Sequence, residues 1–295
     1  MKNGNVKRCI QYIYACVFGL KEKREAKMKM DLFSSKCRYK DEYRDEINYL
    51  KMHNIITMFP YCFREKYLNI EIDVKWDEKK SLHYVMHKEK KLYYPAGMTV
   101  EQIQNTYRAI LLEQDEESPH RYFSSEFDFE DSSIFCDVGC AEANMALEVA
   151  EKASAIFVFE AEARWIPALE ATFEPYRNKV HIINMYAGRE VKPGVTTIDY
   201  ELEKACLPGS LYIKIDAEGA ERDIISGAAN ALETRKVTAA VCTYHKQEDA
   251  VMFEKLFRDM GFQTEFSKGY CIYKHSEKLE PPYFRKGLIR AKNHD

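Results

Sequence analysis

The sequence lacks the patterns that mark several common classes of protein. No two of its nine cysteines form a Cys-x-x-Cys pair, and the number is odd. Several of them lie inside apolar, strand-like runs. We therefore interpret the cysteines as free thiols in a reducing, cytoplasmic compartment, rather than as a disulfide framework or a zinc site. Internal repeats and low-complexity segments are also absent, which argues against a solenoid.

Long hydrophobic runs are scarce. The apolar stretch Cys9–Leu20 has 12 residues, which is too short to span a bilayer, because a helix needs about 20. It follows Lys7-Arg8 as in a signal peptide, but the charged run 21–24 comes after it in place of a small-residue cleavage site. We expect an N-terminal helix, buried against the domain or a partner.

Positive charge is unevenly distributed in a chain of 295 residues with a net charge of −3. Residues 1–40 hold 11 Lys and Arg against 3 Asp and Glu, whereas the remainder holds 33 against 44. Such a basic arm suits an anionic substrate, nucleic acid or an anionic lipid surface, and a solvated face explains it equally well. A weak association with a membrane surface is the less favoured alternative.

The first 120 residues have the character of an accessory α+β region. In residues 1–60, apolar clusters interrupt charged stretches, which indicates helices. Three alternating segments then predict an antiparallel meander, namely Asn69–Trp76, Ser81–His87 and Lys91–Tyr94. Thr99 is placed to cap a helix that carries Ile103 and Tyr107 at helical spacing.

From residue 134 short apolar strands alternate with helices. The expected strands are Ile134–Val138, Ala155–Phe159, Val180–Asn184, Leu211–Ile215 and Val237–Thr243, then a hairpin of Phe262–Phe266 and Tyr270–Tyr273. The expected helices are Ala141–Lys152, Trp165–Phe173, one that contains Ile224 to Leu232, and Asp249–Met260. This alternation predicts an α/β fold with a mostly parallel, Rossmann-like sheet and one antiparallel strand. We assign residues 121–295 to this ligand-binding domain and residues 1–120 to the accessory region.

Open α/β sheets bind ligands beyond the carboxyl ends of their strands, where the strand order reverses. Asp137 and Gly139 form a strand–turn–helix junction there, and glycine lets the backbone turn tightly. Glu160 ends the second strand, 23 residues after Asp137, where an acidic side chain can accept both ribose hydroxyls. Each motif alone is common, but together they favour a nucleoside site.

The turn also indicates which nucleoside binds. Dinucleotides need Gly-x-Gly-x-x-Gly so that the pyrophosphate can lie at a helix N-terminus. Residues 139–144 contain one glycine, and Glu142 would repel a phosphate. S-adenosylmethionine has no phosphate, and an acidic pocket favours its sulfonium and ammonium groups. The residues therefore favour S-adenosylmethionine over a nicotinamide cofactor.

Four motifs within residues 130–275 resemble the FkbM family of class I, S-adenosylmethionine-dependent O-methyltransferases. Residues 137–143 are similar to Asp-Val-Gly-Ala-Asn-x-Gly, with Ala143 in place of the last glycine, and residues 159–161 to Phe-Glu-Pro. Residues 196–199 resemble Thr-Leu-Asp, and residues 213–221 closely match Ile-Lys-Ile-Asp-Val-Glu-Gly-Ala-Glu. The resemblance implies methyl transfer to a hydroxyl of a sugar, glycan or other small acceptor, as in polysaccharide biosynthesis.

The resemblance also implies roles for individual residues. Asp137 and Gly139 would bind the methionine end of the cofactor and Glu160 its ribose. The candidate cofactor-binding residues are Asp137, Gly139, Cys140, Ala141, Glu142, Glu160, Ala161, Asn184, Tyr186 and Ala187. Glu218, Glu221 and His120 are candidates for substrate binding. The segment around His120 would cover the cofactor as a lid, but an ordinary surface loop is the favoured interpretation.

A sugar hydroxyl is a poor nucleophile and needs its proton removed during attack. His245, Asp216 and Lys214 are the candidate bases, and His245 is slightly favoured because an unperturbed histidine titrates near neutral pH. A structural role for His245 is as common, and Lys214 could equally form an ion pair with Asp216 or Glu218. Asp199, Asp216 and Glu218 could hold a divalent metal, but their spacing is weak support and the metal stays open.

Other classes stay open or are disfavoured. The alternatives are a nicotinamide-dependent oxidoreductase and a Rossmann-like protein that binds without catalysis. We expect no nucleic-acid substrate, because Asp216-Ala-Glu-Gly stands where a nucleic-acid N-methyltransferase would carry Asn/Asp-Pro-Pro-Tyr/Phe. Arg285 and Arg290 could meet an anionic acceptor, although a solvated tail is slightly favoured.

Overall fold

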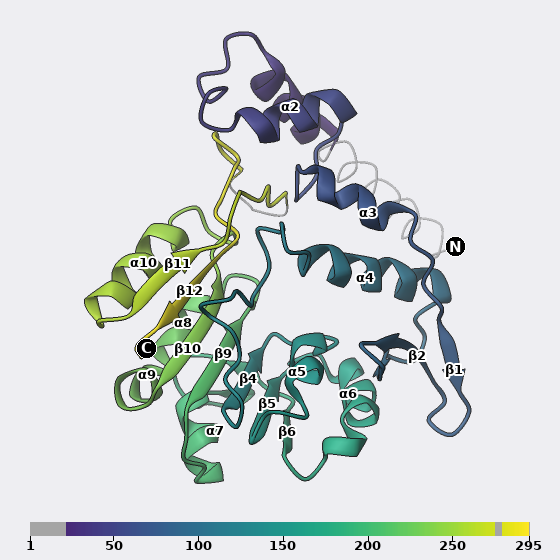
Figure 1. Ribbon diagram of the computed structural model, residues 1–295, viewed down its shortest axis with the longest axis vertical. Helices are drawn as coiled ribbons and strands as arrows, with labels where there is room; N and C mark the ends of the chain where they lie inside the picture. Colours follow the sequence, from purple (N-terminus) through teal and green to yellow (C-terminus); the bar gives the residue numbers. More distant parts are fainter. Residues whose placement is uncertain (1–21, 275–278, 295) are drawn as a thin grey trace, which may run out of the picture. The chain divides into compact units, whose positions relative to one another are not determined.

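The computed structural model of the chain describes residues 22–274 and 279–294 and is shown in Figure 1. The chain divides into two compact units. The first comprises the chain up to Cys62 together with Tyr270–Phe284, and the second comprises Phe63–Gly269 and the residues from Arg285 onward. The boundary expected after residue 120 rests on sequence character and stays a prediction. None of the helices within the described residues has the length and apolar character that a membrane crossing requires.

The first unit is built around helices. Residues 22–33 and α2 (Arg44–His53) are helical, and α2 ends at Asn54, which adopts a left-handed φ of 49°. Met28 and Leu50 belong to its core, which also contains Ile272 from the distant segment. The helical expectation is thus confirmed for these residues, while the predicted helix Cys9–Leu20 lies outside the described ones.

The second unit begins with the predicted meander. Its strands are β1 (Lys75–Asp77), β2 (Leu82–His87) and β3 (Lys90–Tyr93), which pair antiparallel in that order. The first strand begins at Lys75 and not at Asn69. After α3 (Glu65–Leu68) and these strands comes α4 (Val100–Glu113). Thr99 and Gln102 form a reciprocal capping box at its start, so the predicted cap is confirmed.

A seven-stranded sheet forms the centre of this unit, in the order β11-β12-β10-β9-β4-β5-β6 (Figure 1). Its strands are β4 (Ile134–Val138), β5 (Ala155–Phe159), β6 (Val180–Ile183), β9 (Leu211–Ile215), β10 (Val237–Cys242), β11 (Gln263–Phe266) and β12 (Leu288–Lys292). The first five pair in parallel, and β12 runs antiparallel to both of its neighbours. The mostly parallel, Rossmann-like sheet is therefore confirmed. The strand order reverses at β4, between β5 and β9.

The predicted terminal hairpin is wrong in its second strand. Tyr270–Tyr273 forms no strand of this sheet and belongs to the other unit, where the N–H of Ile272 donates to the carbonyl of Met58 at 2.9 Å. The antiparallel partner of β11 is instead β12, which lies some twenty residues further along the chain. Ser267-Lys-Gly has the composition of a tight turn. This turn signal favoured the nearest apolar segment, Tyr270–Tyr273, over β12 as the partner of β11.

Helices cover the sheet and position its loops. They are α5 (Asn144–Val149), α6 (Ile166–Thr172), α7 (Ile198–Ala205), α8 (Glu221–Ser226), α9 (Ala229–Thr234) and α10 (Asp249–Asp259), and β7 (Tyr186–Ala187) pairs with β8 (Val195–Thr196) beside the sheet. One face of the sheet packs on α7–α10. On β4 and β9 the alternate residues Phe135 and Tyr212 stack with ring centroids 5.4 Å apart. α5 begins later than predicted because Ala141 and Ala143 adopt left-handed φ values of 43° and 56°.

Candidate functional site

A cavity of about 480 Å³ opens at the carboxyl ends of the parallel strands, where the strand order reverses. This volume lies within the range of small-molecule sites. Eleven of the residues predicted from the sequence line it: Gly139, Cys140, Ala141, Glu142, Glu160, Ala161, Tyr186, Ala187, Lys214, Asp216 and Glu218. Asp137, Asn184, His120, Glu221 and His245 are not among its lining residues. The structure thus gathers most of the predicted set, while their roles stay predictions.

Gly139 allows the loops after β4 and β9 to touch. Its φ is +68°, and a Cβ atom built on it would lie 1.9 Å from the carbonyl oxygen of Asp216. No larger residue fits without moving one of the loops. The N–H groups of Gly139 and Cys140 both point at the carbonyl of Phe159, at 3.1 and 3.3 Å, which ties this turn to β5.

Glu160 holds the turn with the same carboxylate that is predicted to bind ribose. Its Oε2 accepts from the N–H of Ala141 at 3.0 Å, and its Oε1 accepts from the N–H of Glu162 at 2.7 Å. A carboxylate has about four acceptor positions, so two remain for hydroxyl groups. Asn184 supports the loop from outside the cavity, because its amide donates to the carbonyls of Glu160 and Ala161 at 2.8 and 3.1 Å.

Asp137 and Lys214 face each other across neighbouring strands. They are direct partners in the register of β4 and β9, and Lys214 Nζ lies 2.9 Å from Asp137 Oδ1. The ammonium also donates to the carbonyl of Gly139 at 2.9 Å. Burial alone would lower the pKa of Lys214, but Asp137 and Asp216 more than offset it and raise that pKa above its usual value. Lys214 is therefore a charged structural group and a poor candidate for a base.

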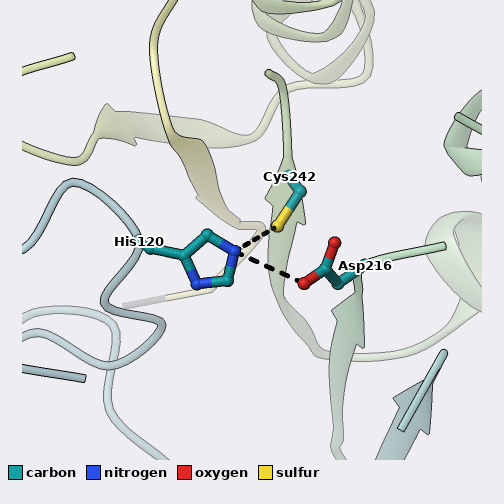
Figure 2. A group of neighbouring side chains, drawn as sticks. All are labelled: His120, Asp216 and Cys242. Atoms are coloured by element: carbon teal, nitrogen blue, oxygen red, sulfur yellow. Dashed lines mark hydrogen bonds and ion pairs between the residues drawn. The ribbon is translucent and has the colours of Figure 1, made fainter. Parts of the chain in front are cut away.

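Asp216, just after β9, accepts hydrogen bonds from two tyrosines. Tyr122 donates to Oδ2 at 2.8 Å and Tyr244 to Oδ1 at 3.1 Å, while His120 Nε2 lies 3.3 Å from Oδ2 (Figure 2). Burial alone would raise the pKa of Asp216, but the hydrogen bond and charge of His120, with Lys214, hold it well below its usual range. Asp216 is thus an ionised carboxylate on the cavity wall.

The expectation of an ordinary surface loop around His120 is wrong. His120 is 1% exposed. The carbonyl of Pro119 accepts from the hydroxyl of Ser267 at 2.5 Å, and a Cβ on Gly287 would lie 1.9 Å from that carbonyl. Burial alone would lower the pKa of His120, but Asp216 and Glu113 raise it. The loop is fixed by residues from the end of the chain, which local polarity could not reveal.

His245 and Glu221 form a buried pair beside the cavity. His245 Nδ1 lies 2.8 Å from Glu221 Oε1, which also accepts from the N–H groups of Ala217 and Gly219 at 3.0 and 3.2 Å. Burial alone would lower the pKa of His245, but Glu221 raises it above its usual value. The pair therefore positions the loop after β9, which carries Asp216.

The predicted solvated tail is also wrong. Arg285 and Arg290 are 5% and 4% exposed. Arg290 donates to the carbonyls of Tyr122 and Arg121 at 2.8 and 2.5 Å, and Arg285 donates to the carbonyl of Tyr244 at 2.6 Å. Both guanidinium groups thus hold the backbone of segments that carry the tyrosines of the site. Asp199, considered as a metal ligand, caps α9 instead, since its carboxylate accepts the N–H groups of residues 230 and 231.

Acidic side chains dominate the lining. They are Glu113, Glu142, Glu160, Glu162, Asp216 and Glu218, against the two cations Arg164 and Lys214. Burial raises the pKa of Glu142 to about 7 and also raises the pKa of Glu113. No role at the site was predicted for Tyr122, Tyr244 or Glu113. Tyr122 lies in the segment considered as a lid and Tyr244 directly follows a predicted strand, whereas Glu113 carried no signal.

An α/β sheet of this topology with an acidic cavity at its switch point defines a Rossmann-like fold of the class I methyltransferase type. Residues 153–264 match the model of the methyltransferase FkbM domain, so the resemblance in the sequence is confirmed for this part of the chain. No curated protein matches the sequence.

Solved structures of methyltransferases are similar to the chain at low identity. One is the methyltransferase FkbM from Methylobacillus flagellatus KT, with 18% identity, a TM-score of 0.44 and coverage of 66% of this chain and 55% of that one. The chain thus spans about half the length of that protein. Precorrin-6y C5,15-methyltransferase from Geobacter metallireducens GS-15 has 13% identity, a TM-score of 0.39 and coverage of 70% and 94%. A putative methyltransferase from Streptococcus mutans in complex with SAH has 12% identity, a TM-score of 0.36 and coverage of 55% of this chain and 89% of that one.

Proposed function

We propose that the protein transfers the methyl group of S-adenosylmethionine to a hydroxyl of a sugar, glycan or other small acceptor. The observation that carries the proposal is the acidic cavity at the switch point of the sheet, which is lined in part by residues 153–264, the stretch that matches the FkbM domain model. A donor with a sulfonium and an ammonium group gains from such a lining, whereas a pyrophosphate would meet Glu142. The acceptor class rests on the family resemblance alone.

Glu160 is suited to the ribose of the donor. Its carboxylate is fixed by two backbone N–H groups and keeps acceptor capacity toward the cavity. Gly139 and Ala141 bring the backbone of the neighbouring turn close to the same space. Because these groups are held before any ligand arrives, little ordering is needed when the nucleoside binds.

Asp216 is the best-placed acceptor for the proton of the hydroxyl. Of the three candidate bases, Asp216 and Lys214 line the cavity, and of these two only Asp216 is unprotonated, because its pKa is lowered whereas that of Lys214 is raised. In the reaction the C–S bond breaks as the C–O bond forms. The hydroxyl proton passes to the Asp216 carboxylate, and S-adenosylhomocysteine leaves. Alignment of hydroxyl and methyl supplies much of the rate, because the displacement is in line.

Calorimetry tests the choice of cofactor. S-adenosylhomocysteine is expected to bind, whereas NAD and NADP are expected not to. Transfer of a labelled methyl group to a panel of sugars and glycans then separates an enzyme from a binding protein. Saturable NAD binding without S-adenosylhomocysteine binding would support the oxidoreductase and refute the methyltransferase.

Replacing Glu160 tests the ribose site. Glu160→Ala removes the two charge-assisted hydrogen bonds that the ribose hydroxyls would donate, so S-adenosylhomocysteine affinity is expected to fall by about 2–4 kcal/mol. Glu162→Ala is the matched control, since that exposed carboxylate lies two residues away at the cavity edge. Thermal unfolding of both variants checks that the turn survives. An unchanged dissociation constant for folded Glu160→Ala would place the ribose elsewhere.

Location and partners remain proposals from the sequence. The described cysteines are free thiols, in line with the reducing compartment that we propose. Of the 11 Lys and Arg in residues 1–40, 7 lie in the described residues 22–40 and 4 lie outside them, and the relation of this basic arm to a membrane surface or an anionic acceptor rests on charge alone.

A further inference from the structure

A second arrangement of side chains meets at Asp216. His120, Asp216 and Cys242 come from three distant segments, and their nitrogen, oxygen and sulfur atoms all lie within 4.8 Å of one another. Figure 2 shows one ring nitrogen of His120 facing both other residues. Nε2 is 3.3 Å from Asp216 Oδ2 and 3.6 Å from Cys242 Sγ.

The two separations from His120 Nε2 are those of ligand atoms around one small ion. Two donors bound to a tetrahedral Zn²⁺ at about 2.0–2.3 Å lie roughly 3.3–3.6 Å from each other. We infer that His120, Asp216 and Cys242 form a binding site for a single transition-metal ion of the zinc class. Three protein ligands and one open position are the arrangement of catalytic rather than structural zinc sites.

The donor set selects the metal. A thiolate together with an imidazole favours zinc over magnesium or calcium, which prefer oxygen ligands. The neighbouring set of Asp216, Glu221 and His245 also lies within 4.8 Å. It is the weaker candidate because Glu221 Oε1 is already engaged by two backbone N–H groups and His245.

The surroundings supply what a metal site requires beyond its ligands. Tyr122 and Tyr244 donate to the two oxygens of Asp216, which is how ligating carboxylates are oriented by outer residues. His120 and Cys242 are 1% and 0% exposed, whereas Asp216 has a side chain that is 21% exposed and lines the cavity. An ion therefore reaches the site from the cavity side.

Titration with cobalt(II) tests the site directly. The full chain carries Cys62→Ser and Cys206→Ser, because these thiols are exposed. After treatment with a chelator, one equivalent of Co²⁺ is expected to bind and give a thiolate-to-cobalt absorption band, which zinc then displaces. Cys242→Ser and His120→Gln should each remove the band. Cys136→Ser is the matched control, since Cys136 is equally buried but on the α7–α10 face, and it should keep the band.

A further variant and the results that would overturn the inference complete the test. Tyr122→Phe should weaken the metal about 10–100-fold, as expected for an outer residue. Absence of cobalt binding in the folded parent protein overturns the inference. The inference is also overturned if the absorption band survives Cys242→Ser, or if Cys136→Ser removes the band as well. If Cys242→Ser does not fold by circular dichroism, His120→Gln decides. None of these readouts depends on methyl transfer, so the site and the proposed function can fail separately.

Discussion

Two carboxyl groups line the same cavity in opposite states. Glu142, in the loop after β4, has polar partners too weak to offset its burial, and its pKa rises to about 7. Asp216, in the loop after β9, is surrounded by donors and cations, and its pKa falls well below its usual range. Pairs of acids pushed apart in this way mark functional sites, because each group can serve a different task. Here Glu142 changes its charge near neutral pH, whereas Asp216 is ionised before the proposed proton transfer.

Replacing Asp216 is expected to have the largest effect. Asp216→Asn should lower turnover by about 10²–10⁴-fold, since the residue would no longer accept the hydroxyl proton. The dissociation constant of S-adenosylhomocysteine should change little. Glu142→Gln should show the reverse pattern, with turnover nearly intact at saturating donor. Single-turnover rates and calorimetry measure both. Equal effects of the two variants on turnover would remove the distinction between the acids.

Substituting Gly139 should separate the two loops. Gly139→Ala requires a left-handed alanine and displaces the Asp216 carbonyl, so the free energy of unfolding should fall by about 2–5 kcal/mol. Gly97→Ala is the control, because its φ is +85° and no atom lies within 4 Å of the added Cβ. It should cost about 1–2 kcal/mol. Urea denaturation of both variants measures the difference in the free energy of unfolding. Equal losses would mean that the two loops can move apart at little energetic cost.

Titration of Glu142 should give the smallest effect. Below pH 7 its carboxyl is mostly protonated, and above pH 7 it is charged and attracts the cationic donor. Affinity for S-adenosylmethionine should therefore rise between pH 6 and pH 8, by up to about tenfold if binding shifts the pKa by one unit. Affinity for S-adenosylhomocysteine, which lacks the sulfonium charge, should rise less. Glu142→Gln should abolish the difference, and a donor affinity that falls with pH would contradict this role.

The sequence was sufficient for the parts of the molecule that follow local rules. Strand and helix periodicity placed the five parallel strands within one residue, and the Thr99 cap was correct. Gly139 and Glu160 were expected at one cavity because the ends of parallel strands must meet at one edge of the sheet, whereas Asp137 is not among the lining residues and pairs with Lys214. Left-handed Ala141 and Ala143 were missed because alanine normally continues a helix.

Contacts between distant segments account for the other errors. The place of β12 beside β10 depends on a pairing across some fifty residues, and no local pattern encodes it. His120 and Tyr122 looked like an exposed polar loop because their partners, Asp216 and Cys242, are about a hundred residues away. The cysteine spacing that excluded a Cys-rich zinc site likewise could not reveal ligands from three separate segments.

The position of β12 also constrains how the protein is made. β11 pairs only with β12 in this sheet, and Arg290 on β12 holds the backbone of Arg121 and Tyr122. During synthesis, the segment that faces Asp216 therefore waits for a residue almost 170 positions later before the carbonyls of Arg121 and Tyr122 accept from the Arg290 guanidinium. Ribosome-bound chains that stop before Leu288 would keep β4, β5, β6, β9 and β10 but lack these anchors. The cavity wall around Asp216 is thus among the last features to form on the nascent chain.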